Sequence, residues 1–448
     1  MFFGKTVHLS PARMILIGFA LLILVGTGVL MLPISTNSPG GATFLDALFT
    51  ATSATCVTGL VVHDTALYWT PFGQAVILIL IQIGGMGVVT VAIAIAMLSG
   101  KKIGLRQRWV MQESIAAPQV GGIVRLTGFV LKMVLLLESI GAILLALRFC
   151  PEVGLLRGIW YGVFHAISAF CNAGFDLFGV RSPFSSLTGH TGDPVVNLVV
   201  MLLIITGGLG FLTWHDIKTH KWHLHAYRLQ SKLILAATMV LLLLPGLFLF
   251  FYEFSQPQWA DLSLQERIFA AAFQAVTPRT AGYNTVDLTQ MSQPSQLLLV
   301  LLMLTGGAPG STAGGFKVTT LAVLLLTTSA VIRRKSSAQC FGRRIAAEVL
   351  PRAVTIFFLY LSLCLLGTLL LCSLEEISLM QALFECASAI GTVGLSLGMT
   401  PDLGSVSKVI LIFLMYVGRV GGVTLVFAIW TGGAMAPAQL PQEKVTVG

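Results

Sequence analysis

Charged side chains are scarce in this sequence of 448 residues. Asp, Glu, Lys and Arg make up 10% of the chain, whereas hydrophobic residues make up 56%. Soluble domains carry about 25% charged residues, so this composition excludes an ordinary soluble protein. The apolar residues form runs such as Met14–Leu32, which is long enough to span a bilayer because a spanning helix needs about 20 residues. The composition therefore predicts an integral membrane protein.

Motifs of common enzymes and nucleotide-binding proteins are missing from the sequence. It holds no HExxH zinc motif, no GxxxxGK[ST] phosphate-binding loop and no GxGxxG in a βαβ unit. Its seven cysteines show no CxxC spacing of the kind that binds metals. We therefore expect a chain that is not an enzyme, carries no covalent cofactor and binds no nucleotide itself.

Basic residues outnumber acidic ones by 27 to 18 and gather in three clusters. The clusters are Lys101, Lys102, Arg106 and Arg108; Lys218, Lys221, Arg228 and Lys232; and Arg333, Arg334, Lys335, Arg343 and Arg344. Segments 33–71 and 373–407 are poor in Lys and Arg. The positive-inside rule therefore places the clusters and both termini in the cytoplasm. No basic surface is interleaved with exposed aromatic residues, so we expect no nucleic-acid partner.

Four short segments resemble one another, and each carries a glycine beside small or hydroxyl residues: Ser53–Leu60, Ser168–Phe175, Val276–Tyr283 and Ser388–Leu395. Their glycines lie 115, 108 and 112 residues apart. Four such loops around one axis can aim backbone carbonyls at a potassium ion and replace its hydration shell. The candidate filter residues are Val57, Thr58 and Gly59; Asn172, Ala173 and Gly174; Thr280, Ala281 and Gly282; and Thr392, Val393 and Gly394. A serine lies six residues before three of the glycines, at Ser53, Ser168 and Ser388, as a tether for the loop or simply as a small residue; Val276 breaks the pattern.

The elements around these loops recur in four units, 1–110, 111–225, 226–340 and 341–448. Each unit holds a long apolar helix, a short apolar stretch, the glycine loop and a second long helix. The long helices are expected at Met14–Leu32 and Phe72–Leu98, Ile123–Phe149 and Pro194–Trp214, Leu229–Phe254 and Ser295–Ile332, and Ala346–Cys372 and Val406–Trp430. The short stretches suit re-entrant segments, because they cannot span the bilayer. The predicted fold is an all-α membrane protein with eight spanning helices and four re-entrant pore helices around one pseudo-fourfold pore.

Each second helix also carries a group of glycines, beginning at Gly84, Gly207, Gly306 and Gly418. Small residues of this kind allow close helix packing. In the third unit the group extends over Thr305–Lys317, whose glycines and proline cannot form a continuous helix. A broken helix at membrane depth is tolerated where it lines a cavity, so we expect a gate below the filter, with a packing hinge as the alternative. The candidate gate residues are Gly306, Gly307, Gly310, Ser311, Thr312, Gly314, Gly315 and Lys317.

Arg419 lies within the last apolar helix, where a charge is costly. It is expected to face the pore or the broken segment, repelling cations or donating hydrogen bonds to carbonyls. Snorkelling of Arg419 or Lys317 to the membrane surface is the alternative.

On these motifs the chain resembles the superfamily of K⁺ transporters that includes Trk, Ktr and plant HKT proteins. The resemblance covers essentially the whole chain and is best at Thr55–Leu60, Asn172–Phe175, Thr280–Tyr283 and Thr392–Leu395. The chain begins almost directly with the first unit, which is similar to the Ktr membrane subunit. The resemblance implies that the filter carbonyls bind K⁺. In related proteins a serine in place of the first glycine accompanies Na⁺ transport, whereas here all four positions are glycine. It also implies a gate formed by the intramembrane loop and Arg419.

The same resemblance implies a homodimer in the bacterial inner membrane, each subunit with its own pore. It further implies a cytosolic ring subunit of the RCK/KTN type that binds the nucleotide, and Lys101–Arg108 and Arg333–Arg344 are the expected docking loops. Passive and Na⁺-coupled permeation both remain open. The alternatives are a Trk-type or Na⁺-permeable HKT-like transporter and an alternating-access transporter. Alternating-access folds usually contain two inverted repeats, whereas this chain holds four units in one orientation.

Overall fold

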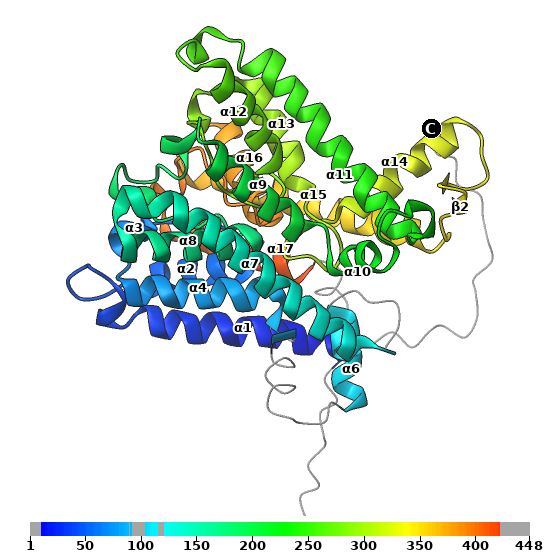
Figure 1. The fold of residues 1–448 in the computed structure, drawn as a ribbon, viewed down its shortest axis with the longest axis horizontal. Helices are drawn as coiled ribbons and strands as arrows, with labels where there is room; N and C mark the ends of the chain where they lie inside the picture. Colours follow the sequence, from blue (N-terminus) through cyan, green and yellow to red (C-terminus); the bar gives the residue numbers. More distant parts are fainter. Residues whose placement is uncertain (1–9, 89, 92–103, 115–120, 422–448) are drawn as a thin grey trace, which may run out of the picture.

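The computed structural model describes residues 10–88, 90–91, 104–114 and 121–421. Nearly all regular structure in this part of the chain is helical (Figure 1). By length and composition, four of the described helices can cross a membrane, or five if the bent pair α9 and α10 forms one span. The predictions of a helical fold and of membrane-spanning apolar helices are confirmed.

Four long helices alternate with shorter ones along the chain. The long helices are α1 (Pro11–Leu30), α7 (Ile123–Val153), α11 (Leu229–Phe248), which continues into the π-helix η5 (Leu249–Glu253), and α15 (Val349–Leu374). A short helix follows each of them: α2 (Phe44–Cys56), α8 (Leu155–Phe170), α12 (Leu264–Val276) and α16 (Leu379–Gly391). The glycine loops then lead towards α4 (Pro71–Met86), α9 (Pro194–Gly208) with α10 (Phe211–His220), α13 (Gln293–Leu304) with α14 (Val318–Ile332), and α17 (Ser405–Val420).

Smaller elements make up the connections. Two further α-helices are α3 (Thr65–Tyr68) and α6 (Leu105–Ser114). The 3₁₀-helices are η1 (Pro33–Ser35), η2 (Phe178–Val180), η3 (Thr188–His190), η4 (Leu224–Ala226), η6 (Pro257–Trp259), η7 (Leu288–Gln290) and η8 (Thr400–Asp402). Strands β1 (Gln339–Cys340) and β2 (Arg343–Arg344) form an antiparallel hairpin that pairs Gln339 with Arg344.

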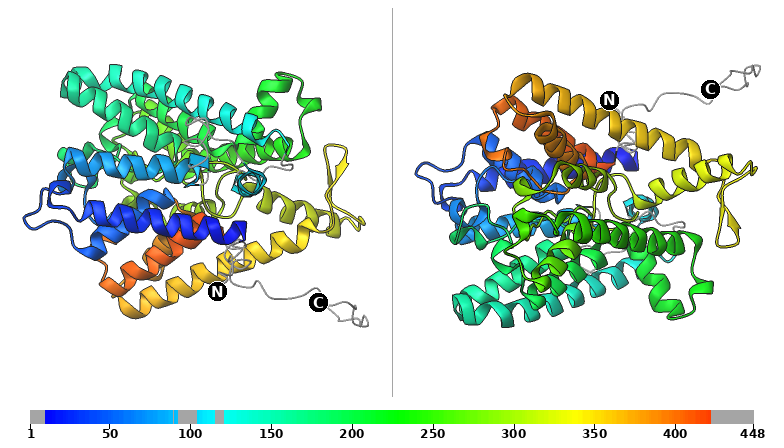
Figure 2. Two further views of the ribbon diagram at one scale, coloured as in Figure 1. Left: turned by 90° about the horizontal axis from the view of Figure 1, so that it is seen from below. Right: turned by 90° about the horizontal axis from the view of Figure 1, so that it is seen from above.

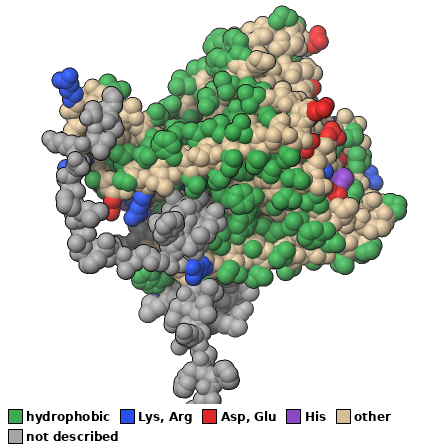
Figure 3. All heavy atoms as spheres, turned by 180° about the vertical axis from the view of Figure 1, so that it is seen from behind, with side chains coloured by type: hydrophobic (Ala, Val, Ile, Leu, Met, Phe, Trp, Pro, Cys, Tyr) green, Lys and Arg blue, Asp and Glu red, His purple; other side chains and the backbone are tan. Residues whose placement is uncertain are grey.

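The long helices form the outside of the molecule. Only 28–33% of the residues in their most apolar windows are buried, and their exposed side chains are largely leucine and isoleucine. Figure 3 shows the resulting hydrophobic band across one face, with acidic side chains gathered at one end. Such a large exposed apolar surface is explained by contact with lipid.

The short helices form the inside of the molecule, as Figure 2 illustrates. Each of them packs against a helix that follows another glycine loop: α2 on α17, α8 on α4, α12 on α9, and α16 on α13. These four contacts form a closed cycle. At least one fully buried phenylalanine anchors each short helix: Phe49 in α2, Phe164 and Phe170 in α8, Phe273 in α12, and Phe384 in α16.

The helices that follow the loops end earlier than the hydrophobic runs predict. The continuous helix expected over Pro194–Trp214 is wrong, because α9 ends at Gly208 and α10 turns away from it by 97°. Gly210 has φ +83, and glycine in this left-handed region commonly ends a helix. Helices α4 and α17 end in the same way before Gly87 and Gly421. Residues 92–98 and 422–430 of the other expected spans lie outside the described residues.

Candidate functional site: a ring of glycine loops above a broken helix

Each glycine loop leaves the C-terminus of a short helix with the same backbone pattern. The loop glycines Gly59, Gly174, Gly282 and Gly394 have φ values of +91, +70, +80 and +95. Two residues earlier, Val57, Asn172, Thr280 and Thr392 have φ values of +58, +59, +65 and +49. Three of these four are β-branched, for which a positive φ is a strained conformation. Strain of this kind persists where the surrounding structure imposes it, and it concentrates at functional sites.

The four loops contact one another in a closed cycle. A Cβ atom added to Gly59 would lie 2.4 Å from the carbonyl oxygen of Ala173 in the second loop, and one added to Gly174 would lie 2.6 Å from that of Ala281 in the third. A Cβ added to Gly282 would lie 2.5 Å from the carbonyl oxygen of Val393 in the fourth loop, and one added to Gly394 would lie 2.2 Å from that of Thr58 in the first. Real Cβ atoms do not approach oxygen so closely, so each position requires glycine. One carbonyl oxygen of each loop therefore lies against the glycine of a neighbouring loop, which closes the cycle.

Hydroxyl groups at the ends of the short helices tether the loops. Ser53 Oγ accepts a hydrogen bond from Gly59 N–H at 3.1 Å, and Ser388 Oγ accepts one from Gly394 N–H at 3.0 Å. Ser168 Oγ instead donates to the carbonyl of Phe175 at 2.9 Å. The three serines therefore tether the loop backbone by hydrogen bonds, in addition to packing as small residues.

The third loop has its own tether, which the spacing of the serines does not predict. Val276 carries no hydroxyl, but Thr277 Oγ1, one residue later, donates to the carbonyl of Tyr283 at 2.6 Å. The Tyr283 hydroxyl then donates to the carbonyl of Phe175 at 3.1 Å, which links the third loop to the second. A search for a hydroxyl residue either five or six positions before the loop glycine would have found Thr277.

A cavity of about 210 Å³ opens on one side of the ring. All four loop glycines line it, together with the carboxylates of Asp64, Asp176 and Asp287. Asp64 is used structurally, since it accepts hydrogen bonds from the backbone of Ala66, Leu67 and Phe184. Burial raises the pKa of Asp176 to about 7, and the charge of Asp64 acts in the same direction.

Beyond the ring, the helices that follow the loops pack closely on the short helices through their own glycines. A Cβ added to Gly84 would lie 2.0 Å from the carbonyl oxygen of Thr55, and one added to Gly207 would lie 2.0 Å from that of Phe170. A Cβ added to Gly418 would lie 2.2 Å from the carbonyl oxygen of Ile390. The carbonyl lies four residues before the loop glycine in all three cases. Close backbone approach is the role of these glycines.

The stretch between α13 and α14 is not helical, as the sequence predicts. The segment folds back on itself, with Gly306 N–H donating to Phe316 O at 2.9 Å and Val318 N–H donating to Gly307 O at 3.1 Å. It also docks on the end of α9, where Ala308 N–H donates to Gly208 O at 2.9 Å. Ser311 Oγ donates to Ala308 O at 2.7 Å within the segment.

Two residues of the glycine loops contact this broken segment through their side chains. Thr312 Oγ1 lies 2.8 Å from Asn172 Oδ1 and 3.1 Å from the carbonyl oxygen of Phe170. A Cβ on Gly314 would lie 2.0 Å from Thr392 Oγ1, so Gly314 rests directly on Thr392. The broken segment therefore touches the second and fourth loops, which the sequence pattern does not reveal.

Arg419 and Lys317 both bind carbonyl groups around the broken segment. Arg419 Nη1 donates to the carbonyl of Thr312, and Nη2 donates to those of Gly84 and Gly85, the latter at 3.0 Å. Lys317 Nζ donates to the carbonyls of Ala313 at 2.7 Å and Gly314 at 3.2 Å. Arg419 thus joins three parts of the chain, whereas the hydrogen bonds that Lys317 donates to described residues stay within its own segment.

Comparison with known proteins agrees with this geometry. Residues 21–431 match the family model TrkH, described as cation transport protein. The chain is 41% identical to the potassium/sodium uptake protein NtpJ of Enterococcus hirae over 98% of both chains. It is also 41% identical to the Ktr system potassium uptake protein B of Bacillus subtilis, over 95% of this chain and 94% of the relative.

A solved structure shares the fold. The potassium transporter TrkH of Vibrio parahaemolyticus superposes with a TM-score of 0.73 over 96% of this chain and 87% of the other, at 19% sequence identity. At this identity the match concerns the fold alone, and the family follows from the sequence matches. The chain belongs to the TrkH family of cation transport proteins.

Proposed function

We propose that this chain is the potassium-translocating membrane subunit of a Ktr-type uptake system. The closed cycle of glycine-to-carbonyl contacts among the four loops is the observation that carries the proposal. A ring of carbonyl oxygens can replace the hydration shell of a K⁺ ion. The C-termini of the short helices, which bear partial negative charge, lead into the loops and favour a cation. The names of the relatives from E. hirae and B. subtilis support potassium as the transported ion.

The ring and the helix packing support a fourfold plan. In this plan, residues 1–110, 111–225, 226–340 and 341–448 form four repeats with eight spanning helices and four re-entrant pore helices around one pseudo-fourfold pore. The cycle of contacts α2–α17, α8–α4, α12–α9 and α16–α13 has the form expected of such a pore. The Asp-lined cavity then faces the outside, where negative charge raises the local concentration of cations.

The broken segment and Arg419 form the gate in this proposal. Arg419 connects Thr312 in the segment to Gly84 and Gly85 on α4, so it holds the segment in place below the ring. The positive charge also opposes cations that pass it. Opening requires the hydrogen bond between Arg419 and Thr312 to break.

Control of the gate is assigned to a partner. We propose a homodimer in the bacterial inner membrane with both termini in the cytoplasm, and a cytosolic nucleotide-binding ring of the RCK/KTN type. The exposed arginines Arg333, Arg334, Arg343 and Arg344 around the β-hairpin are suited to dock the ring. Lys101 and Lys102, in the other expected docking loop, lie outside the described residues.

Uptake of ⁸⁶Rb⁺ into proteoliposomes tests the proposal. We expect uptake that unlabelled K⁺ competes for, and parallel measurements with and without Na⁺ distinguish passive from Na⁺-coupled permeation. A Gly282→Ala protein that folds but still transports at the wild-type rate would contradict the filter assignment. Equal permeation of Na⁺ and Rb⁺ would instead favour a Na⁺-permeable transporter.

A further inference from the structure

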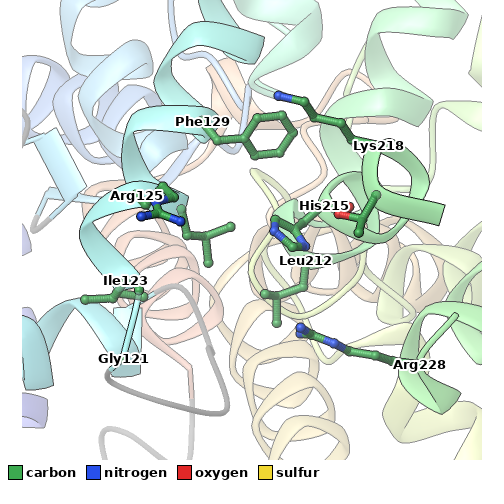
Figure 4. A pocket seen from close by; sticks show the side chains of 11 residues that line it. Gly121, Ile123, Arg125, Phe129, Leu212, His215, Lys218 and Arg228 are labelled. Atoms are coloured by element: carbon green, nitrogen blue, oxygen red, sulfur yellow. Dashed lines mark hydrogen bonds between the residues drawn. The ribbon is translucent and has the colours of Figure 1, made fainter. Parts of the chain in front are cut away.

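A basic cavity of about 500 Å³ lies away from the ring of glycine loops, between the N-terminus of α7, α10 and the start of α11 (Figure 4). Its lining includes Arg125, Phe129, His215, Lys218 and Arg228. Among the described residues, no acidic one lines it. Helix α10, which supplies part of the lining, lies towards the end of the molecule where α6 and β2 are found (Figure 1).

The positive charges of this cavity are only partly compensated. Arg228 Nε lies 3.6 Å from Asp216 Oδ1, so it has a carboxylate partner. Within the described part of the chain, neither Arg125 nor Lys218 forms an ion pair. Lys218 Nζ lies 4.6 Å from the centre of the Phe129 ring, a contact that orients the ammonium group without neutralising it. The site therefore holds at least two uncompensated positive charges.

The N-terminus of α7 adds a second attraction for an anion. Helix α7 is 31 residues long and begins after Gly122, which has φ +76 and provides no side-chain cap. The first N–H groups of a helix have no partner within the helix and carry partial positive charge. A Cβ built on Gly121 or Gly122 would meet no described atom within 4 Å, so the described part of the chain leaves this end open. Helix N-termini of this kind bind phosphate groups.

Exposed apolar side chains lie further along α7 and α11, two of the helices that border the cavity. Leu135 and Leu136 on α7 are 62% and 52% exposed, and Met239 and Val240 on α11 are 58% and 52% exposed. Acyl chains can lie along these side chains while a headgroup occupies the basic cavity. Basic pockets between membrane helices recognise anionic lipid headgroups in this way.

We propose that this cavity binds the phosphate ester in the headgroup of an anionic phospholipid. The basic lining accounts for the phosphate, and the exposed apolar side chains of α7 and α11 account for the acyl chains. Arg125 and Lys218 contact the phosphate from opposite walls, and the N-terminus of α7 faces it. A soluble phosphate ester shares this chemistry but has no acyl chains for the leucine-lined helices. The proposal does not depend on ion transport by the four loops.

Native mass spectrometry of the full chain in detergent, titrated with phosphatidylglycerol, tests the assignment. Each basic residue near a lipid phosphate contributes about fivefold to affinity, so Arg125→Gln/Lys218→Gln should weaken binding by about 25-fold. The control Arg333→Gln/Lys335→Gln removes the same charge from exposed positions outside the cavity lining and should bind as the wild type does. The variant Arg125→Lys/Lys218→Arg keeps both charges and should retain most of the binding, which separates a lost site from a misfolded protein.

Glycerol-1-phosphate, added to the same proteins, separates the two sources of phosphate. We expect it to bind far more weakly than phosphatidylglycerol. Tight binding of glycerol-1-phosphate that depends on Arg125 and Lys218 would support a phosphate site but refute the lipid assignment. Equal phosphatidylglycerol binding by the wild type and Arg125→Gln/Lys218→Gln would overturn the proposal.

Discussion

Replacing Arg419 with methionine tests whether one side chain holds the broken segment closed. Methionine has an unbranched, flexible side chain that donates no hydrogen bond, so the contacts to Thr312, Gly84 and Gly85 are lost together. Only the contact to Thr312 reaches the segment, because Gly84 and Gly85 belong to α4. We therefore expect the substitution to release the segment and raise basal ion flux.

The size of the effect follows from that single contact. A hydrogen bond to a charged group contributes about 1.5–3 kcal/mol, and about 1.4 kcal/mol changes an equilibrium tenfold. Loss of the Arg419–Thr312 bond should therefore shift the closed-to-open equilibrium by roughly 10- to 100-fold. The flux should rise by the same factor until the open state predominates.

The assay is ⁸⁶Rb⁺ uptake by proteoliposomes that contain the membrane subunit alone. Lys408→Met, on the same helix but away from the broken segment, is the matched control for loss of a positive charge. Arg419→Lys keeps the charge but cannot bridge Thr312 and α4 at once. If only the methionine variant conducts more, the charge closes the path rather than the hydrogen bond. A folded Arg419→Met protein with wild-type flux would refute both readings.

Three further predictions concern the ring, its contact with the broken segment, and the cavity that Asp176 lines. Gly282→Ser should lower ⁸⁶Rb⁺ uptake about tenfold or more, because its Cβ would press on the carbonyl of Val393 in a backbone that disfavours side chains; undiminished uptake would contradict this. Thr312→Val keeps the shape but removes the hydroxyl beside Asn172, so basal flux should rise about fivefold, and an unchanged flux would show that this contact does not hold the segment. Asp176, whose pKa burial raises to about 7, is largely protonated at pH 6 and ionised at pH 8, so half-saturation for Rb⁺ should fall as the pH rises. In Asp176→Asn that dependence should disappear, and its persistence would assign it to another group.

Much of the architecture could be predicted from the sequence because it depends on local patterns. Apolar run lengths separate spanning helices from short ones, since the bilayer has a fixed thickness. The recurrence of a glycine after each short helix predicts the four loops, and the structure gives all four a positive φ at that residue. Ser53 and Ser388 could be suspected as tethers because a fixed sequence offset places their hydroxyl near the loop backbone.

Other features depend on the local backbone conformation, and the sequence pattern does not reveal them. The sharp turn after α9 was missed because the hydrophobic run continues through Gly210, although glycine there ends the helix. The tether of the third loop was missed because the hydroxyl moves by one residue, from the position of Val276 to Thr277. In both cases the backbone conformation, rather than the hydrophobicity, decides the outcome.

The sequence alone determined that this protein spans a membrane and carries four glycine loops, because composition, run length and spacing are properties of neighbouring residues. Only the tertiary structure decided that the loops close into a cycle and that Arg419 reaches Thr312 and α4. It alone placed Arg125, Lys218 and the N-terminus of α7 around one cavity. Each of these arrangements joins residues that are far apart in the chain. Helix packing sets the distances between them, and such packing produces no repeating pattern in the sequence from which it could be predicted.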